Sequence, residues 1–230
     1  YKGYTVGDIW GYVTGGILQE GDFDGVGANG KPLYHGPYFK GGQAYPGYIW
    51  YQDLDHDGVI TTGLNTVDDP GDRKVIGNNA PRYRYNITAN FQYKGFDLDL
   101  MFQGVGKRDY WLSSTSSYWG NGAGSWEVYN NSWTPERTDA KFPMYGSGIG
   151  SYAQSGYLLD ASYIKLKQVI LGYTFPRALI NKIGLEKLRL NLAAYNLFTI
   201  SDMPKYYDAD YLSDAYPPKR TFSVGIQVGF

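Results

Sequence analysis

The last eleven residues of the chain are Arg220-Thr-Phe-Ser-Val-Gly-Ile-Gln-Val-Gly-Phe230. Apolar side chains alternate here with polar or small residues, without a break. A period of two is typical of a β-strand with one apolar and one polar face. Such a face can be buried in a soluble sandwich, but a strand that ends on its own apolar aromatic residue favours contact with lipid.

The same alternation recurs upstream. Residues 82–93 and 96–103 alternate on either side of Lys94-Gly95, which predicts an antiparallel hairpin. Residues 162–175 change phase near Gln168, which predicts a β-bulge because one extra residue moves every later side chain to the opposite face. Residues 176–184 predict a short connection with one helical turn, and residues 186–200 another strand. Residues 4–13 predict an irregular strand, so we expect about six strands.

Composition excludes several classes of protein. The 230 residues include 24 tyrosines and 31 glycines, no cysteine, and a net charge of −1. Disulfides, thiolate metal sites and a nucleic-acid partner are therefore not expected. No run approaches the roughly 18 apolar residues of a membrane helix, whereas a membrane barrel strand needs only about ten alternating residues. The N-terminus has no signal-peptide pattern, and we expect it to be the interior of a longer chain.

Long irregular segments separate the predicted strands at residues 14–81, 104–157 and 201–217. Because consecutive antiparallel strands reverse direction, all three long loops are expected on one side and the short turns at 94–95 and 176–185 on the other. Outer-membrane barrels have this arrangement, with long extracellular loops and short periplasmic turns. The narrowest such barrels need about eight strands, so further strands must come from elsewhere. We predict an all-β, antiparallel transmembrane barrel segment.

Several segments together resemble the SusC/RagA group of TonB-dependent outer-membrane transporters. They include PGYIWYQDLDHDGVI (46–60) and PPKRTFSVGIQVGF (217–230). The other matching segments are 10–19, 72–106, 133–143, 162–176 and 182–200. The resemblance implies that residues 1–230 are the C-terminal part of a barrel of about 22 strands, whose plug domain and TonB-contacting segment are absent from this chain.

The resemblance also implies a function and partners. Such transporters import oligosaccharides or peptides across the outer membrane of Gram-negative cells by TonB-dependent transport. A SusD-like surface lipoprotein closes over each barrel, and oligomers of these transporter–lid pairs are expected. This chain departs from the family pattern at residues 61–71, which lengthen the loop between the aspartate motif and the Asp72-Arg73 segment.

An acidic stretch at residues 53–61 has the first half of a calcium-binding loop. Asp53, Asp55 and Asp57 stand at positions 1, 3 and 5, Gly58 allows the sharp turn, and the carbonyl of Val59 stands at position 7.

Position 12 of this loop, where a bidentate glutamate normally closes the site, is Leu64. The closing carboxylate must come from Asp68, Asp69 or Asp72, and Asp72 is favoured because it lies in a segment that resembles the family. We therefore predict a structural Ca²⁺ in an extracellular loop. The predicted ligands are Asp53, Asp55, Asp57, Val59 and Asp72. The alternative is an Asp/Gly-rich turn that binds no ion.

The second long loop is crowded with aromatic residues. They are Trp111, Trp119, Trp126, Trp133, Tyr110, Tyr118 and Tyr129. Exposed aromatic side chains could stack on sugar rings or contact a lid protein. The alternative is that they pack one loop against another or form the aromatic girdle of a barrel.

No set of residues supports catalysis, and we predict that the chain is not an enzyme. His35 and His56 are isolated, and Ser147 matches only part of a Gly-x-Ser-x-Gly motif. Asp97 and Asp99 suggest the paired carboxylates of glycosidases, but we interpret them as solvated residues of a barrel interior. The other charges of the polar strand faces are also predicted to be solvated. They are Arg82, Arg84, Arg189, Lys165 and Lys167.

Two other functions remain open at this point. A secreted, soluble, calcium-braced lectin or adhesin would explain both the acidic loop and the tryptophan-rich segment. A passive porin would share the barrel and would lack a plug. Substrate-binding residues cannot be assembled from the sequence.

Overall fold

The computed structural model describes residues 3–39, 42–113, 119, 125–148, 151–205, 207–212 and 218–230. Tyr118 and residues 213–217 of the predicted loop 201–217 lie outside the described residues. The chain forms two compact units. One comprises Tyr1–Ala80 and Asp109–Leu159, and the other Pro81–Arg108 and Asp160–Phe230.

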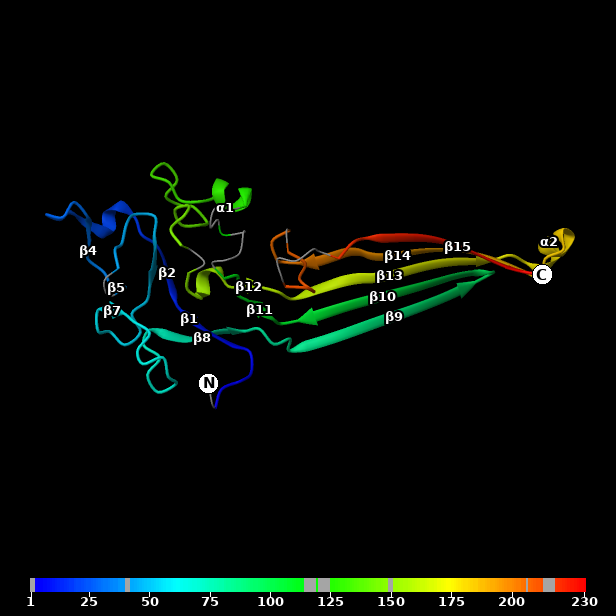
Figure 1. The fold of residues 1–230 in the computed structure, drawn as a ribbon, viewed down its shortest axis with the longest axis horizontal. Coiled ribbons are helices and arrows are strands. Elements are labelled where there is room, and N and C mark those ends of the chain that lie inside the picture. The colour runs from blue at the N-terminus through cyan, green and yellow to red at the C-terminus, as the bar shows by residue number, and fades with distance from the viewer. Residues whose placement is uncertain are drawn as a thin grey trace. The chain divides into compact units, whose positions relative to one another are not determined.

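The second unit is built around one antiparallel sheet of long strands (Figure 1). The strands are β9 (Tyr83–Tyr93), β10 (Phe96–Gly106), β13 (Tyr163–Thr174), β14 (Lys187–Ser201) and β15 (Thr221–Gly229). Their order across the sheet is β15-β14-β13-β10-β9. The predicted hairpin is confirmed as β9 and β10, and Lys94 and Gly95 between them both have positive φ angles, as a type I′ turn requires.

One face of this sheet is lined by apolar residues from all five strands. One row of paired residues runs from β9 to β15. It consists of Phe91, Leu98, Leu171, Leu192 and Val224. Several apolar side chains on this face are open to their surroundings, and 70% of the Phe222 surface and 76% of the Val224 surface are exposed. A soluble sandwich would bury such a face, whereas a membrane barrel presents it to lipid.

The predicted bulge in β13 is confirmed. In the pairing of β10 with β13, Met101 lies opposite Gln168 and Phe102 lies opposite Leu166, so Lys167 is the extra residue. Because of this extra residue, Leu166 and Val169 lie on the same apolar face although their numbers differ by three. The pairing of β13 with β14 is also irregular between Leu166 and Gln168.

The β13–β14 connection has the predicted helical turn. It consists of α2 (Arg177–Ile180) and the 3₁₀ turn η3 (Asn181–Ile183), followed by Gly184 with φ of 74°. This connection and the 94–95 turn lie at the same end of the sheet (Figure 1).

The first unit is made of short strands and turns. Its strands are β1 (Asp8–Tyr12), β2 (Thr14–Ile17), β3 (Phe23–Val26), β4 (Pro32–Tyr34), β5 (Tyr38–Phe39), β6 (Ile49–Tyr51), β7 (Val59–Ile60) and β8 (Arg73–Asn78). Two further strands, β11 (Asp109–Tyr110) and β12 (Leu159–Asp160), follow later in the chain. The helical turns are η1 (Glu20–Asp22), α1 (Trp126–Asn130) and η2 (Ser155–Tyr157). Tyr12, Tyr51 and Ile60 form its buried core.

Residues 4–13 do not extend the large sheet. The strand they contain, β1, pairs with β8 in a sheet of its own, and its register shifts between Ile9 and Trp10. Within the described residues the large sheet therefore has five strands rather than six. Ile76 of β8 is the extra residue at the register shift between β1 and β8, because Ile9 lies opposite Gly77 and Trp10 lies opposite Val75. No helix among the described residues combines the length and the apolar character that crossing a bilayer requires.

A charge placed on the apolar face should disturb assembly in a membrane. We expect Val224→Lys to lower the free energy of unfolding of the intact protein in lipid by about 2–4 kcal/mol, because lysine would meet hydrocarbon. The measurement is urea unfolding in vesicles. The control is Ser223→Lys, which places the same residue on the opposite face one position away. Equal effects of the two substitutions would contradict the assignment of the faces.

Candidate functional site

The polar face of the large sheet carries side chains that bond across strands. Arg189 forms an ion pair with Asp97, and Asn90 donates to Asp99. Asp99 is therefore engaged by the adjacent strand β9, and Asp97 is engaged by β14 across the intervening strand β13. This arrangement agrees with interior wall residues and does not resemble two carboxylates poised on either side of a glycosidic bond.

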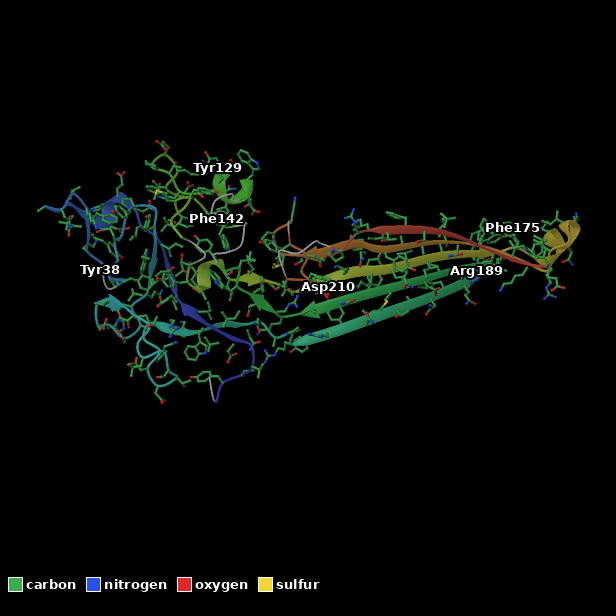
Figure 2. The ribbon with its side chains drawn as sticks, in the orientation of Figure 1. Tyr38, Tyr129, Phe142, Phe175, Arg189 and Asp210 are labelled. Carbon is green, nitrogen blue, oxygen red and sulfur yellow. The ribbon has the colours of Figure 1, made fainter. Side chains whose placement is uncertain are left out.

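A second group of charges lies at the other end of the sheet, as the positions of Arg189 and Asp210 in Figure 2 show. Lys165 of β13 donates to both oxygens of Asp208 at 2.8 Å and lies 3.5 Å from Asp210. Only 1% of the Lys165 side chain is exposed. The prediction that Lys165 is solvated is therefore wrong. The segment that follows β14 returns over the sheet and covers this lysine.

The Asp210 carboxylate accepts several hydrogen bonds in this group of charges. Tyr163 Oη donates to its Oδ1 at 2.6 Å, and Lys167 Nζ lies 2.9 Å from its Oδ2. Burial raises the pKa of Asp210, but the hydrogen bonds from Tyr163 and Lys167 outweigh burial and hold the pKa below its ordinary value. Asp210 is therefore ionised at neutral pH. Its charge fixes residues 207–212 to the sheet.

The acidic loop of the first unit brings together three of its predicted ligands. Carboxylate oxygens of Asp53, Asp55 and Asp72 all lie within 4.8 Å of one another. Asp72 is completely buried, and its two oxygens accept from the amides of Leu54 at 2.8 Å and Thr61 at 2.7 Å. This carboxylate joins the two ends of the loop.

Asp57 and Val59 are not part of this group of three carboxylates. Instead, Asp57 Oδ1 accepts from the amide of Val59 at 2.8 Å and so shapes the turn. Three converging carboxylates nevertheless provide hard oxygen donors of the kind that Ca²⁺ binds. The residues present therefore fit a divalent cation.

The pKa values of this loop show opposing influences. Desolvation raises the pKa of Asp53, but hydrogen bonds from the amides of Gly58 and His56 hold it below its ordinary value. The amide of Asp57 lowers the pKa of Asp55, but desolvation and the charge of Asp72 together raise it above its ordinary value. Repulsion between Asp55 and Asp72 is the kind of interaction that a bound cation relieves.

The tryptophan-rich loop contains both buried and exposed rings. Trp119 and Trp133 are buried, and their indole N–H groups donate to Leu112 O at 2.7 Å and Gln19 Oε1 at 3.0 Å. Trp133 therefore packs its loop against the loop of residues 14–81, whereas Trp119 packs within its own loop. Trp126 is 71% exposed and remains open to a partner or ligand.

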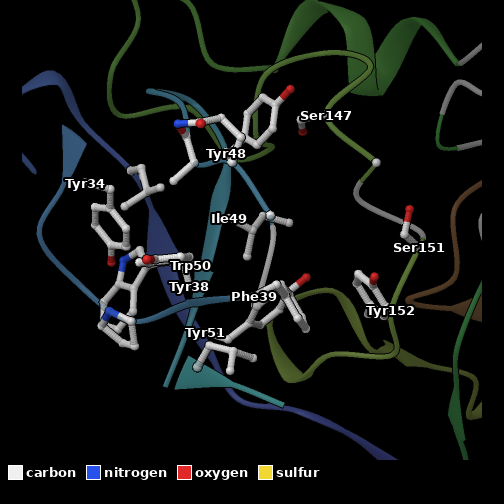
Figure 3. Close-up of a pocket in the computed structure, with 17 residues that line it drawn as sticks. Tyr34, Tyr38, Phe39, Tyr48, Ile49, Trp50, Tyr51, Ser147, Ser151 and Tyr152 are labelled. Carbon is white, nitrogen blue, oxygen red and sulfur yellow. The ribbon is translucent and has the colours of Figure 1, made fainter. Parts of the chain in front are cut away.

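An aromatic pocket that we did not predict lies in the first unit (Figure 3). Its volume is about 170 Å³, and its lining includes Phe39, Tyr51 and Tyr152. The rings of Phe39 and Tyr152 stack with centroids 4.8 Å apart. A cavity of about 150 Å³ accepts one benzene ring, so this pocket suits a single six-membered ring. The dense tyrosines of residues 34–51 were its only signal in the sequence.

Comparison with known proteins relates this chain to one group. No family model matches the sequence. TonB-dependent receptor P3 of Formosa agariphila is 30% identical over 246 aligned residues, which cover 100% of this chain and 22% of the relative. TonB-dependent receptor SusC of Bacteroides thetaiotaomicron is 26% identical over 80% of this chain and 19% of its own length.

The structure of the RagAB peptide transporter has the same fold, with a TM-score of 0.65, 18% identity, and coverage of 97% of this chain and 22% of that chain. The chain is a segment of a SusC/RagA-like TonB-dependent receptor. It spans about a fifth of the length of the curated relatives it matches. The predicted family is thereby confirmed.

The identification assigns the two faces of the large sheet. In a transmembrane barrel segment the apolar face contacts lipid and the polar face lines the interior. The charged side chains around Lys165 therefore belong to the interior. This Lys165 group consists of Lys165, Lys167, Tyr163, Asp208 and Asp210. The relatives are receptors and transporters rather than enzymes, which agrees with the prediction that this chain has no catalytic role.

The Lys165 group makes a testable contribution to stability. We expect Lys165→Met in the full-length receptor to destabilise the docking of residues 207–212 on the sheet by about 3–5 kcal/mol, because it leaves Asp208 without its buried partner. Faster hydrogen exchange of residues 207–212 would report this change. Lys167→Met is the control and should have a smaller effect, since 30% of the Lys167 side chain is exposed. Unchanged exchange in Lys165→Met would show that the ion pair does not hold the segment.

Proposed function

We propose that this chain forms part of the barrel wall of a receptor that imports oligosaccharides or peptides across the outer membrane of a Gram-negative cell. The observation that carries the proposal is the large sheet, with an unbroken apolar face and a polar face rich in charges. The relatives named TonB-dependent receptor support TonB as the source of energy.

We further propose that the receptor acts with a SusD-like surface lipoprotein. The names SusC and RagAB among the similar proteins support such a partner. The remaining barrel strands and a plug would come from the rest of the receptor. Oligomers of receptor–lipoprotein pairs are part of the same proposal. The exposed Trp126 and the aromatic pocket are surfaces on which a ring of a sugar or an aromatic amino acid could pack.

A soluble lectin or adhesin is the less favoured function. Its advantage was that it explained the acidic loop and the tryptophans together. It does not explain why large apolar side chains on one face of the sheet are exposed. In water each of these side chains would lack the stabilisation of about 1.5–3 kcal/mol that full burial gives. Retention of the intact protein in aqueous buffer without detergent would support the soluble alternative.

Uptake by cells tests the import proposal. We expect cells with the receptor to accumulate a labelled oligosaccharide or peptide mixture, and to lose this accumulation when the receptor or TonB is deleted. The measurement is cell-associated label after washing. Uptake of a small porin-permeant sugar is the control and should not change. Accumulation that persists without TonB would indicate passive diffusion and contradict the proposal.

We also propose that the acidic loop holds a structural Ca²⁺ through Asp53, Asp55 and Asp72, with Asp57 and the carbonyl of Val59 as the further predicted ligands. The support is the convergence of three carboxylates, one of them fully buried. The ion would brace an extracellular loop and would take no part in chemistry. This role explains why residues 53 and 72, far apart in sequence, lie together.

Protease resistance of residues 46–77 tests the cation proposal. We expect Ca²⁺ to protect this segment in the full-length receptor and EDTA to remove the protection, because the ion would join both ends of the loop. Asp55→Asn should weaken the protection. Asp68→Asn is the matched control, since exposed Asp68 lies outside the group of three carboxylates. Identical digestion with Ca²⁺ and with EDTA would count against the site.

A further inference from the structure

A polar pocket lies at the end of the large sheet that carries the Lys165 group. Its volume is about 360 Å³, and it is contained within the second unit. Arg84, Asn86, Gln103 and Arg108 contribute polar groups to its lining. Arg84 and Asn86 come from β9, Gln103 from β10, and Arg108 follows the end of β10. Arg84, Asn86 and Gln103 belong to the polar face of the sheet, which lines the barrel interior under the proposed function, and Tyr85 and Gly104 of the opposite face complete the pocket wall.

Arg108 is a buried charge with incomplete bonding. Only 8% of its surface is exposed, and its Nη2 donates to the carbonyls of Ala161, at 3.2 Å, and Ala209. Its Nε is fully buried and donates to no described atom. A guanidinium is rarely buried without an anionic partner, because removing it from water is costly unless its charge is compensated.

Arg84 adds a second positive charge to the same pocket. Its side chain is exposed, and it forms no ion pair within the described part of the chain. Burial is the largest influence on the pKa of Arg108 and lowers it, while Tyr163 and Asp210 raise it. The charge of Arg84 has a smaller effect and also lowers this pKa, so the two guanidinium groups repel one another. Two like charges on one pocket are stabilised when an anion lies between them.

Asp210 also lines the pocket and its charge raises the pKa of Arg108, but it forms no ion pair with either arginine in the described structure. Its carboxylate accepts from Tyr163 at 2.6 Å and Lys167 at 2.9 Å, and it lies 3.5 Å from Lys165. Gln103 donates to it at 3.3 Å. Because the two lysines engage the Asp208 and Asp210 carboxylates, Arg84 has no carboxylate partner among the described residues. Arg108 lines the pocket beside it with 8% of its surface exposed.

We propose that this pocket binds an oxyanion, a carboxylate or sulfate group carried by the imported solute, through Arg84 and Arg108. The inference rests on the proposed import function and narrows its substrate to acidic oligosaccharides or peptides. Guanidinium groups form charge-assisted, frequently bidentate hydrogen bonds with such anions. Asn86 and Gln103 provide neutral amides beside them, which suits an anion that also carries hydroxyl or amide groups.

Anion titration of the purified full-length receptor in detergent tests this proposal. The probes are sodium sulfate and sodium acetate, titrated at constant ionic strength with sodium chloride as the background. We expect at least one probe to bind, and we expect Arg84→Gln to weaken it about tenfold or more, as loss of one charge-assisted hydrogen bond predicts. The preferred probe distinguishes a sulfate-bearing solute from a carboxylate-bearing one.

Arg82→Gln is the matched control, because it removes the same charge from the residue just before β9, outside the pocket lining. Arg108→Lys keeps the charge but loses the forked donor, and should also weaken binding. Arg84→Gln decides the outcome, since Arg84 holds no other described residue in place and its loss should leave the fold intact.

Two results would overturn the proposal. One is that neither probe binds above the chloride background, and the other is that Arg84→Gln binds as tightly as the native receptor. The titration needs neither TonB nor transport. Anion binding without TonB-dependent uptake would therefore reject the import function, and uptake without anion binding would reject only this site.

Discussion

Backbone hydrogen bonding between neighbouring long strands is the constraint on which the large sheet depends. Hydrocarbon offers no partner for a peptide N–H or C=O, so each strand that contacts lipid must pair along its length. The pairing runs without interruption from β9 to β15. It sets every side chain on one of two faces, and the separation of lipid-facing and interior residues follows from it. The edges of β9 and β15 need partner strands for the same reason.

The positive charges at the Lys165 end of the interior wall fall into two groups with different roles. Lys165 and Lys167 are paired with carboxylates of the segment that returns over the sheet, and they hold this segment in place. Arg84 and Arg108 lie beside them without a carboxylate partner in the described residues. The first group is structural. The second is available to a solute, and its position is maintained by the first.

Local patterns in the sequence predicted the hairpin, the bulge and the helical turn, because each depends on residues adjacent along the chain. The alternation of residues 162–175 was enough to locate the extra residue within one position of Lys167. The acidic loop was partly predictable, since its spacing suggested Asp53 and Asp55 and the family resemblance favoured Asp72. Long-range contacts were not predictable in this way. Lys165 was expected to be solvated because nothing near it in sequence indicates that Asp208, 43 residues later, covers it.

The bulge at Lys167 divides β13 into two halves in which different residues, odd-numbered or even-numbered, face the interior. Before it, odd-numbered residues such as Lys165 face the interior, and after it the even-numbered Gln168 and Ile170 do. A single substitution along this strand leaves the assignment of its faces unchanged, whereas a one-residue deletion near position 167 would move the side chains of half of the strand to the opposite faces. A chimaeric receptor with a crossover inside β13 would keep its apolar residues toward the membrane only when both parents carry the extra residue.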